Sequence, residues 1–200
     1  MGLFCLLWIP IFYLFRRSVT GDGGGGYIWA ILLGSAAVLM HLFFGSLFEP
    51  GGFGFSRWAF GFVEIVSIPV FIPLAVYWLL VSLRALPASV SQENFALLWL
   101  IPQGAFRSVN WISDGNPQVL VLVPVLWAAQ AVGMPFFINY ILRGSRWYVI
   151  AVSVFCATAL PLIASSCWWA FFSHQAFIGL LLLCASLVPA IISLIMDYNR

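Results

Sequence analysis

Residues 147–196 read WYVIAVSVFCATALPLIASSCWWAFF-SHQ-AFIGLLLLCASLVPAIISLIM, and this stretch contains no aspartate, glutamate, lysine or arginine. It consists of two apolar runs, residues 147–172 and 176–196, which are separated by Ser173, His174 and Gln175. A membrane-spanning α-helix needs about 20 predominantly apolar residues, and both runs are long enough. The stretch therefore predicts two helices that cross a lipid bilayer and are joined by a short turn.

The rest of the chain has the same character. Hydrophobic residues make up 64% of it and charged residues 7%, with a mean hydropathy of +1.07. A soluble domain with this composition would expose large apolar patches and aggregate. The net charge of +2 and the lack of any basic run argue against a nucleic-acid partner. We therefore expect an integral membrane protein whose partner is the lipid bilayer, located in the plasma (inner) membrane.

Some chemistry is excluded by residues that are missing. There is no lysine, so neither a Schiff base nor the lysine of a phosphate-binding P-loop can form. The cysteines lie inside apolar stretches and form no CxxC pair, which favours small buried side chains over disulfides or metal ligands; they are Cys5, Cys156, Cys167 and Cys184. We expect no cofactor.

Six apolar blocks are clear, at residues 2–15, 27–48, 58–83, 119–142, 147–172 and 176–196. A seventh block, 94–112, is ambiguous because Pro102, Gly104 and Arg107 interrupt it. It either crosses the membrane or forms a re-entrant loop that breaks at mid-depth. The predicted fold is all-α: one integral membrane domain over residues 1–200, a polytopic helix bundle with about seven membrane segments.

The distribution of arginine decides between these alternatives, because cytoplasmic loops carry an excess of basic residues. If residues 94–112 cross, six arginines lie inside and two outside; without that crossing the division is even and carries no bias. We therefore predict seven crossings, with the N-terminus outside and the C-terminus inside. The inside set is Arg16, Arg17, Arg84, Arg143, Arg146 and Arg200, and the outside set is Arg57 and Arg107.

The intramembrane ionisable residues give the sharpest prediction of a site. His41 lies about seven residues before the outer end of block 27–48, and Glu64 about seven residues after the outer start of block 58–83. At 1.5 Å per residue both lie roughly 10 Å below the outer surface. We predict that they face each other, with Arg57 close enough to reach Glu64. Such a pair is either a substrate, ion or proton site or a structural link between two helices.

Other polar residues extend this candidate site. Gln103 and Arg107 are expected to climb toward the outer face and to line or cap a cavity there, although Arg107 at an ordinary interfacial end is the alternative. Gln130 is a further hydrogen-bonding candidate near the middle of its block. His41, Glu64 and His174 are weak metal candidates, since no local spacing enforces the set and His174 reads better as a solvated loop histidine. We predict no catalytic residue and no resident metal.

Three functions remain open. A small-molecule or ion transporter, or its substrate-binding membrane subunit, fits the prolines within the long blocks and the polar groups gathered toward one face. A non-catalytic subunit of a larger membrane complex, with other membrane subunits as partners, would explain the short loops and the lack of motifs. An enzyme acting on a lipid-borne substrate ranks last, because no nucleophile and base occur at a recognised spacing.

Overall fold

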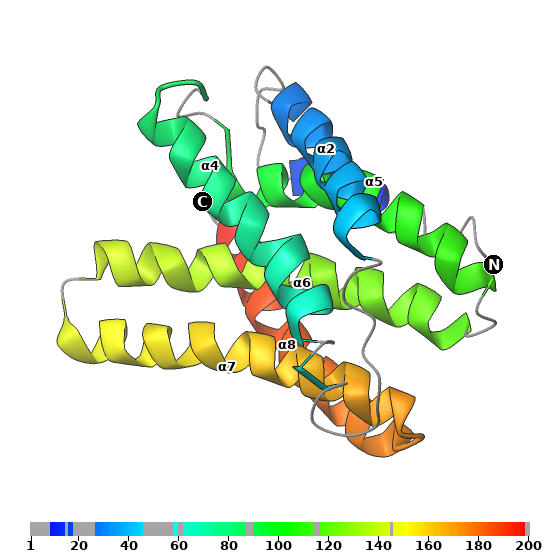
Figure 1. Ribbon diagram of the computed structural model, residues 1–200. Coiled ribbons are helices and arrows are strands. Elements are labelled where there is room, and N and C mark those ends of the chain that lie inside the picture. The colour runs from blue at the N-terminus through cyan, green and yellow to red at the C-terminus, as the bar shows by residue number, and fades with distance from the viewer. Residues whose placement is uncertain are drawn as a thin grey trace.

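The computed structural model describes residues 9–14, 16, 17, 27–45, 58, 59, 62–86, 90–113, 117–144 and 146–198. At 40–45, 64–68, 107–113, 117–120, 197 and 198 the backbone alone is described. Within these ranges every regular element is a helix (Figure 1). The elements that follow the N-terminal helical residues 9–14, 16 and 17 are α2 (Tyr27–Gly45), the π-helix η2 (Phe62–Phe71), α4 (Ile72–Ser82), α5 (Gln92–Ser113), α6 (Pro117–Arg143), α7 (Trp147–Phe172) and α8 (Ala176–Tyr198).

Three helices are long and apolar enough to cross a membrane. These segments are Val121–Arg143, Trp147–Phe172 and Ala176–Met196, which confirms the extents expected for the last three blocks. Most of α6 is buried among its neighbours α5, α7, α8 and η2. By contrast, α7 and α8 expose large apolar side chains such as Phe155 and Phe177, as expected of surfaces that face lipid rather than water.

Helix α5 corresponds to the ambiguous block, and it is continuous through Pro102. Proline removes one backbone donor and crowds the preceding turn, so a break was a reasonable expectation. The neighbouring helix α2 accommodates the proline ring, because a Cβ built on Gly34 would lie 3.0 Å from Pro102 Cγ. The missing side chain at Gly34 is therefore what lets α2 and α5 pack closely at this level.

The contacts of α5 define the directions of three helices. Tyr27 and Gly34 of α2 meet Asn94 and Trp99 of α5 in the same chain order, so α2 and α5 run parallel. Gly104 of α5 approaches the indole of Trp127 on α6, and the short 114–116 connection makes α5 and α6 antiparallel neighbours.

Local chemistry explains the helix ends. The Ser91 hydroxyl accepts a hydrogen bond from the Asn94 amide at 3.1 Å, so Ser91 caps the start of α5. Arg84 and His174 adopt left-handed backbone conformations, with φ of 57° and 60°. Both follow the last turn of a helix, α4 and α7 respectively, where this conformation closes the final backbone bonds.

The expected single helix 58–83 has two forms in the described part. Residues of η2 form wide π-type turns that include Pro69, and α4 follows directly with Pro73 in its first turn. A π-helix is uncommon and often marks a functional position. The side chain of Tyr77, in the middle of α4, links this helix to the residues just before α5, because its hydroxyl donates to the Val90 carbonyl at 2.9 Å.

Candidate functional site

The predicted His41–Glu64 site lies largely outside the described side chains. The backbones of His41 and Glu64 belong to α2 and η2, and that of Arg107 belongs to α5. Their side chains, and the whole of Arg57, lie outside the described residues. The facing pair therefore stays a prediction, as do the roles of Arg57 and Arg107.

Gln103 is buried between α5 and α2, and its expected place beside an outward cavity stays a prediction. Its Nε2 donates to the Gly34 carbonyl at 3.4 Å, which joins α5 to α2. Gly34, whose missing side chain leaves room for the Pro102 ring, thus also provides the carbonyl that accepts the hydrogen bond from Gln103. The Gln103 Oε1 atom is buried and accepts no hydrogen bond from any described group.

Trp99 of α5 and Gln130 of α6 are two further buried polar side chains. Trp99 is one turn before Gln103 on α5, and its indole Nε1 has no hydrogen-bond partner among the described residues. Gln130 of α6 is completely buried, and both its Nε2 and its Oε1 lack a partner in the described part of the chain. Because Gly104 meets Trp127, the antiparallel register places Gln130 at the level between Trp99 and Gln103.

These buried atoms without hydrogen-bond partners lower the stability of the folded protein. A buried polar group without a hydrogen bond costs about 1–3 kcal/mol, and the cost is not relieved by lipid, which offers no hydrogen bonds. Four such atoms occur on Trp99, Gln103 and Gln130. The sequence marked Gln103 and Gln130 as polar residues within apolar blocks, but it did not single out Trp99.

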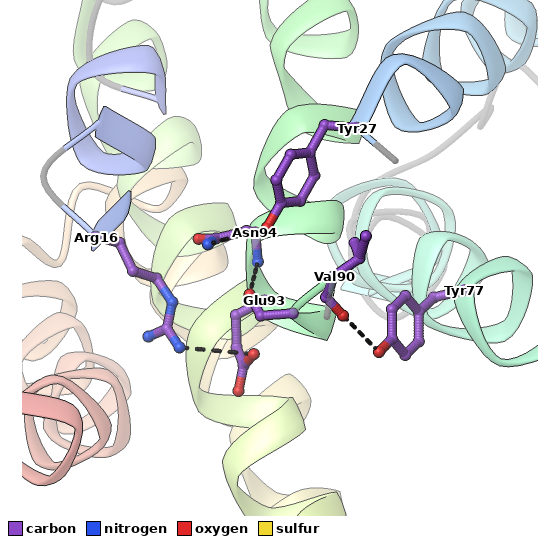
Figure 2. Close-up of polar contacts among 7 residues, drawn as sticks. Arg16, Tyr27, Tyr77, Val90, Glu93 and Asn94 are labelled. Atoms are coloured by element: carbon purple, nitrogen blue, oxygen red, sulfur yellow. Dashed lines mark hydrogen bonds and ion pairs between the residues drawn. The ribbon is translucent and has the colours of Figure 1, made fainter. Parts of the chain in front are cut away.

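A second polar cluster, which the sequence did not reveal, surrounds the start of α5 (Figure 2). Arg16 Nη2 lies 3.5 Å from Glu93 Oε2, with side chains only 3% and 11% exposed. The sequence placed Arg16 among the arginines expected on the inner side and did not single out Glu93. Both residues lie directly beside apolar runs, which is the only sign in the sequence that either is buried. Nothing in either segment indicates that two residues 77 positions apart contact each other.

Neighbouring side chains extend this cluster, as Figure 2 shows. Asn94 Nδ2 donates to the Tyr27 hydroxyl at 3.5 Å, and the Tyr27 ring packs edge-on against Tyr13 with centroids 6.0 Å apart. The cluster therefore ties the first helical segment, α2 and the start of α5 to one another at one end of the bundle. The Arg16–Glu93 and Asn94–Tyr27 contacts each join two different helices, so the cluster has a structural role in holding them together.

His174 lies exposed in the turn between α7 and α8. Within the described ranges, no three His, Cys, Asp or Glu side chains come together in a way that could hold a metal ion. The side chains of His41 and Glu64 lie outside the described residues, so their grouping with His174 stays a prediction. His174 itself has a left-handed backbone with φ of 60°, a conformation that glycine adopts more readily.

Three buried hydroxyl and thiol groups contact backbone carbonyls. Ser165 Oγ donates to the Pro161 carbonyl and Ser186 Oγ to the Leu183 carbonyl, both within their own helices. Cys167 Sγ contacts the Gly179 carbonyl at 3.3 Å across the α7–α8 pair. These geometries join helices or satisfy donors, and none pairs a nucleophile with a base.

Comparison with known proteins gives no further assignment. No family model matches the chain, and neither a curated protein nor a solved structure matches it.

Proposed function

We propose that this chain is a multi-pass integral membrane protein of about seven segments, with the N-terminus outside and the C-terminus inside. Three helices of spanning length support it, and so do the parallel α2–α5 and antiparallel α5–α6 directions, which match an alternating path in which α5 crosses. We propose the plasma (inner) membrane as its location.

This topology is tested by labelling single cysteines introduced at Arg146 and His174 in a chain without its native cysteines. Both positions are exposed, Arg146 just before α7 and His174 just after it, so a membrane-impermeant maleimide should label Arg146→Cys from inside and His174→Cys from outside. Labelling of both from one side would refute the arrangement.

We further propose that the bundle is a transporter, or the substrate-binding subunit of one, that holds a small polar solute at the level of Trp99, Gln103 and Gln130. Gln130 gives this proposal its main support, because it is fully buried and neither of its amide atoms is hydrogen-bonded within the described chain. A protein that only needed packing at this position would do better with leucine or methionine. Retaining the amide is favoured when its hydrogen bonds are made to something the protein binds.

The chemistry of the three side chains narrows the solute class. Trp99 and Gln130 offer N–H donors, and Gln103 and Gln130 offer carbonyl acceptors. None of these groups carries charge, so they suit a neutral solute with both donors and acceptors, such as an amide, a polyol or a heterocyclic base. A ring would also stack favourably on the Trp99 indole.

The test begins with the chain purified in mild detergent and analysed by mass spectrometry for retained small molecules. We expect a polar, uncharged compound that is released on unfolding and is absent from Gln130→Leu, whereas Gln175→Leu in the exposed α7–α8 turn retains it. Release of the same compound from vesicles containing the protein then distinguishes a transporter from a binding subunit.

The assembly-subunit alternative makes a different prediction in the same experiment. Stoichiometric partner chains with no retained solute, and unchanged behaviour of Gln130→Leu, would refute solute binding. Those results would assign the buried amides to packing within a larger membrane complex.

A further inference from the structure

The turn between α6 and α7 gathers cationic and aromatic side chains at one end of the bundle. The spanning segments Val121–Arg143 and Trp147–Phe172 meet at this turn. At 1.5 Å per residue they are about 35 and 39 Å long, against a hydrocarbon core of about 30 Å. Helices of this length that cross a bilayer can reach the headgroup layer, and in Figure 1 their shared end extends past the start of α5.

Side chains of this turn are poorly covered by the protein itself. Arg143 and Arg146 are both exposed, and Trp147 is 79% exposed, the highest value among the large apolar side chains that the structure describes. Leu142 is 61% exposed beside them. Two cations next to bulky apolar groups match the boundary between acyl chains and charged headgroups.

Local contacts hold one of these cations in place. Arg146 Nη1 donates to the Tyr148 hydroxyl at 2.7 Å, and its guanidinium carbon lies 6.0 Å from the centroid of that ring. This arrangement restrains the guanidinium and so lowers the entropy lost when an anion binds. Arg146 also precedes α7 in an extended conformation without capping the helix through its side chain.

The balance of charge around the turn favours an anion. Tyr140 contacts Met196 at 3.8 Å, so the end of α8 approaches here. Asp197 follows Met196 in the chain, giving one carboxylate against the two arginines. The opposite turn of the hairpin, Ser173 to Gln175, carries no arginine.

From these observations we propose that the α6–α7 turn is a binding site for an anionic phospholipid. Arg143 and Arg146 would contact the phosphate, and the exposed rings of Trp147 and Tyr148 would lie along the upper acyl chain and glycerol region. The proposal rests on the chain spanning a membrane but not on solute binding at Gln130. The geometry favours a lipid over free phosphate, because apolar side chains flank the cations.

Native mass spectrometry of the detergent-purified chain tests this inference. The chain is titrated separately with phosphatidylglycerol and phosphatidylcholine. We expect tighter retention of phosphatidylglycerol by the wild type, and a preference lost in R143Q/R146Q. Each cation near an anionic surface contributes about fivefold in affinity, so the double variant should bind phosphatidylglycerol about 25-fold more weakly.

A charge-matched control separates a site from general attraction. Arg17 and Arg84 are also exposed and are predicted to lie on the same side of the membrane, so R17Q/R84Q removes the same charge elsewhere. Retained lipid preference in that variant supports the α6–α7 site, while equal loss in both double variants overturns it.

Two further measurements complete the test. Should R143Q/R146Q not fold, R146Q alone is predicted to lose about fivefold, and an unchanged affinity would overturn the proposal. Displacement of phosphatidylglycerol by millimolar inorganic phosphate would also overturn it, because the apolar flanks would then contribute nothing. Solute retention serves as an independent readout, since it should be unaffected in every one of these variants.

Discussion

Replacing Gln130 with leucine should stabilise the protein once small molecules have been removed. Both amide atoms of Gln130 are buried without a described partner. At about 1–3 kcal/mol each, they disfavour folding by about 2–6 kcal/mol. A leucine at this fully buried position removes that cost, and the change in shape costs less than about 1.5 kcal/mol. We therefore expect a net stabilisation of about 2 kcal/mol.

Thermal unfolding in mild detergent measures this effect after extensive washing of the protein. For a chain of this length, 1 kcal/mol corresponds to about 2–4 °C in the unfolding midpoint, so we expect a rise of about 4–8 °C. Gln103→Leu is the informative comparison. That substitution also loses the bond from Nε2 to the Gly34 carbonyl, so its gain should be close to zero.

A fall in the midpoint of washed Gln130→Leu would refute the reasoning. It would mean that the amide makes favourable hydrogen bonds within the folded protein alone, and the argument for a bound solute would lose its basis. Gln175→Leu, at an exposed glutamine, should change stability by less than about 0.5 kcal/mol.

Three other substitutions test the packing. Arg16→Met leaves the Glu93 carboxylate buried without its cation, so unfolding should require about 3 kcal/mol less free energy, measured by thermal or denaturant unfolding. Gly34→Ala places a Cβ 2.6 Å from the Trp99 carbonyl oxygen; the helices must separate, which should lower stability by about 2 kcal/mol in the same assay. His174→Gly removes a side chain from a backbone with φ of 60° and should raise stability by about 0.5–1 kcal/mol.

Each of these has its own control. The double substitution Arg16→Met with Glu93→Leu should recover most of the loss, and a single Arg16→Met that unfolds like the wild type would contradict the buried pair. Ala36→Leu on the exposed side of α2 should leave stability unchanged; if it is as harmful as Gly34→Ala, the close α2–α5 approach is not the cause. Substituting His174 with alanine, which keeps a Cβ, should bring no comparable gain.

The helices themselves were predictable because lipid imposes a local rule: every apolar run must satisfy its own backbone hydrogen bonds. Composition therefore located α6, α7 and α8 to within a few residues. The π-turns of η2 were not predictable, since they depend on how the segment packs on α6 and α7 as well as on Pro69. The continuity of α5 through Pro102 depended on the glycine of another helix.

For the candidate sites, features within one segment could be predicted from the sequence, whereas contacts between residues far apart in the chain could not. That Gln103 and Gln130 are polar residues inside apolar runs is visible in the chain alone, because each run has few polar interruptions. Which of their atoms find partners is decided by the neighbours that folding brings to them, such as the Gly34 carbonyl at 3.4 Å from Gln103 Nε2. The Arg16–Glu93 pair is the clearest case. Local hydropathy determines where helices form, but long-range packing determines which charges meet, because no pattern within either segment encodes the other's position.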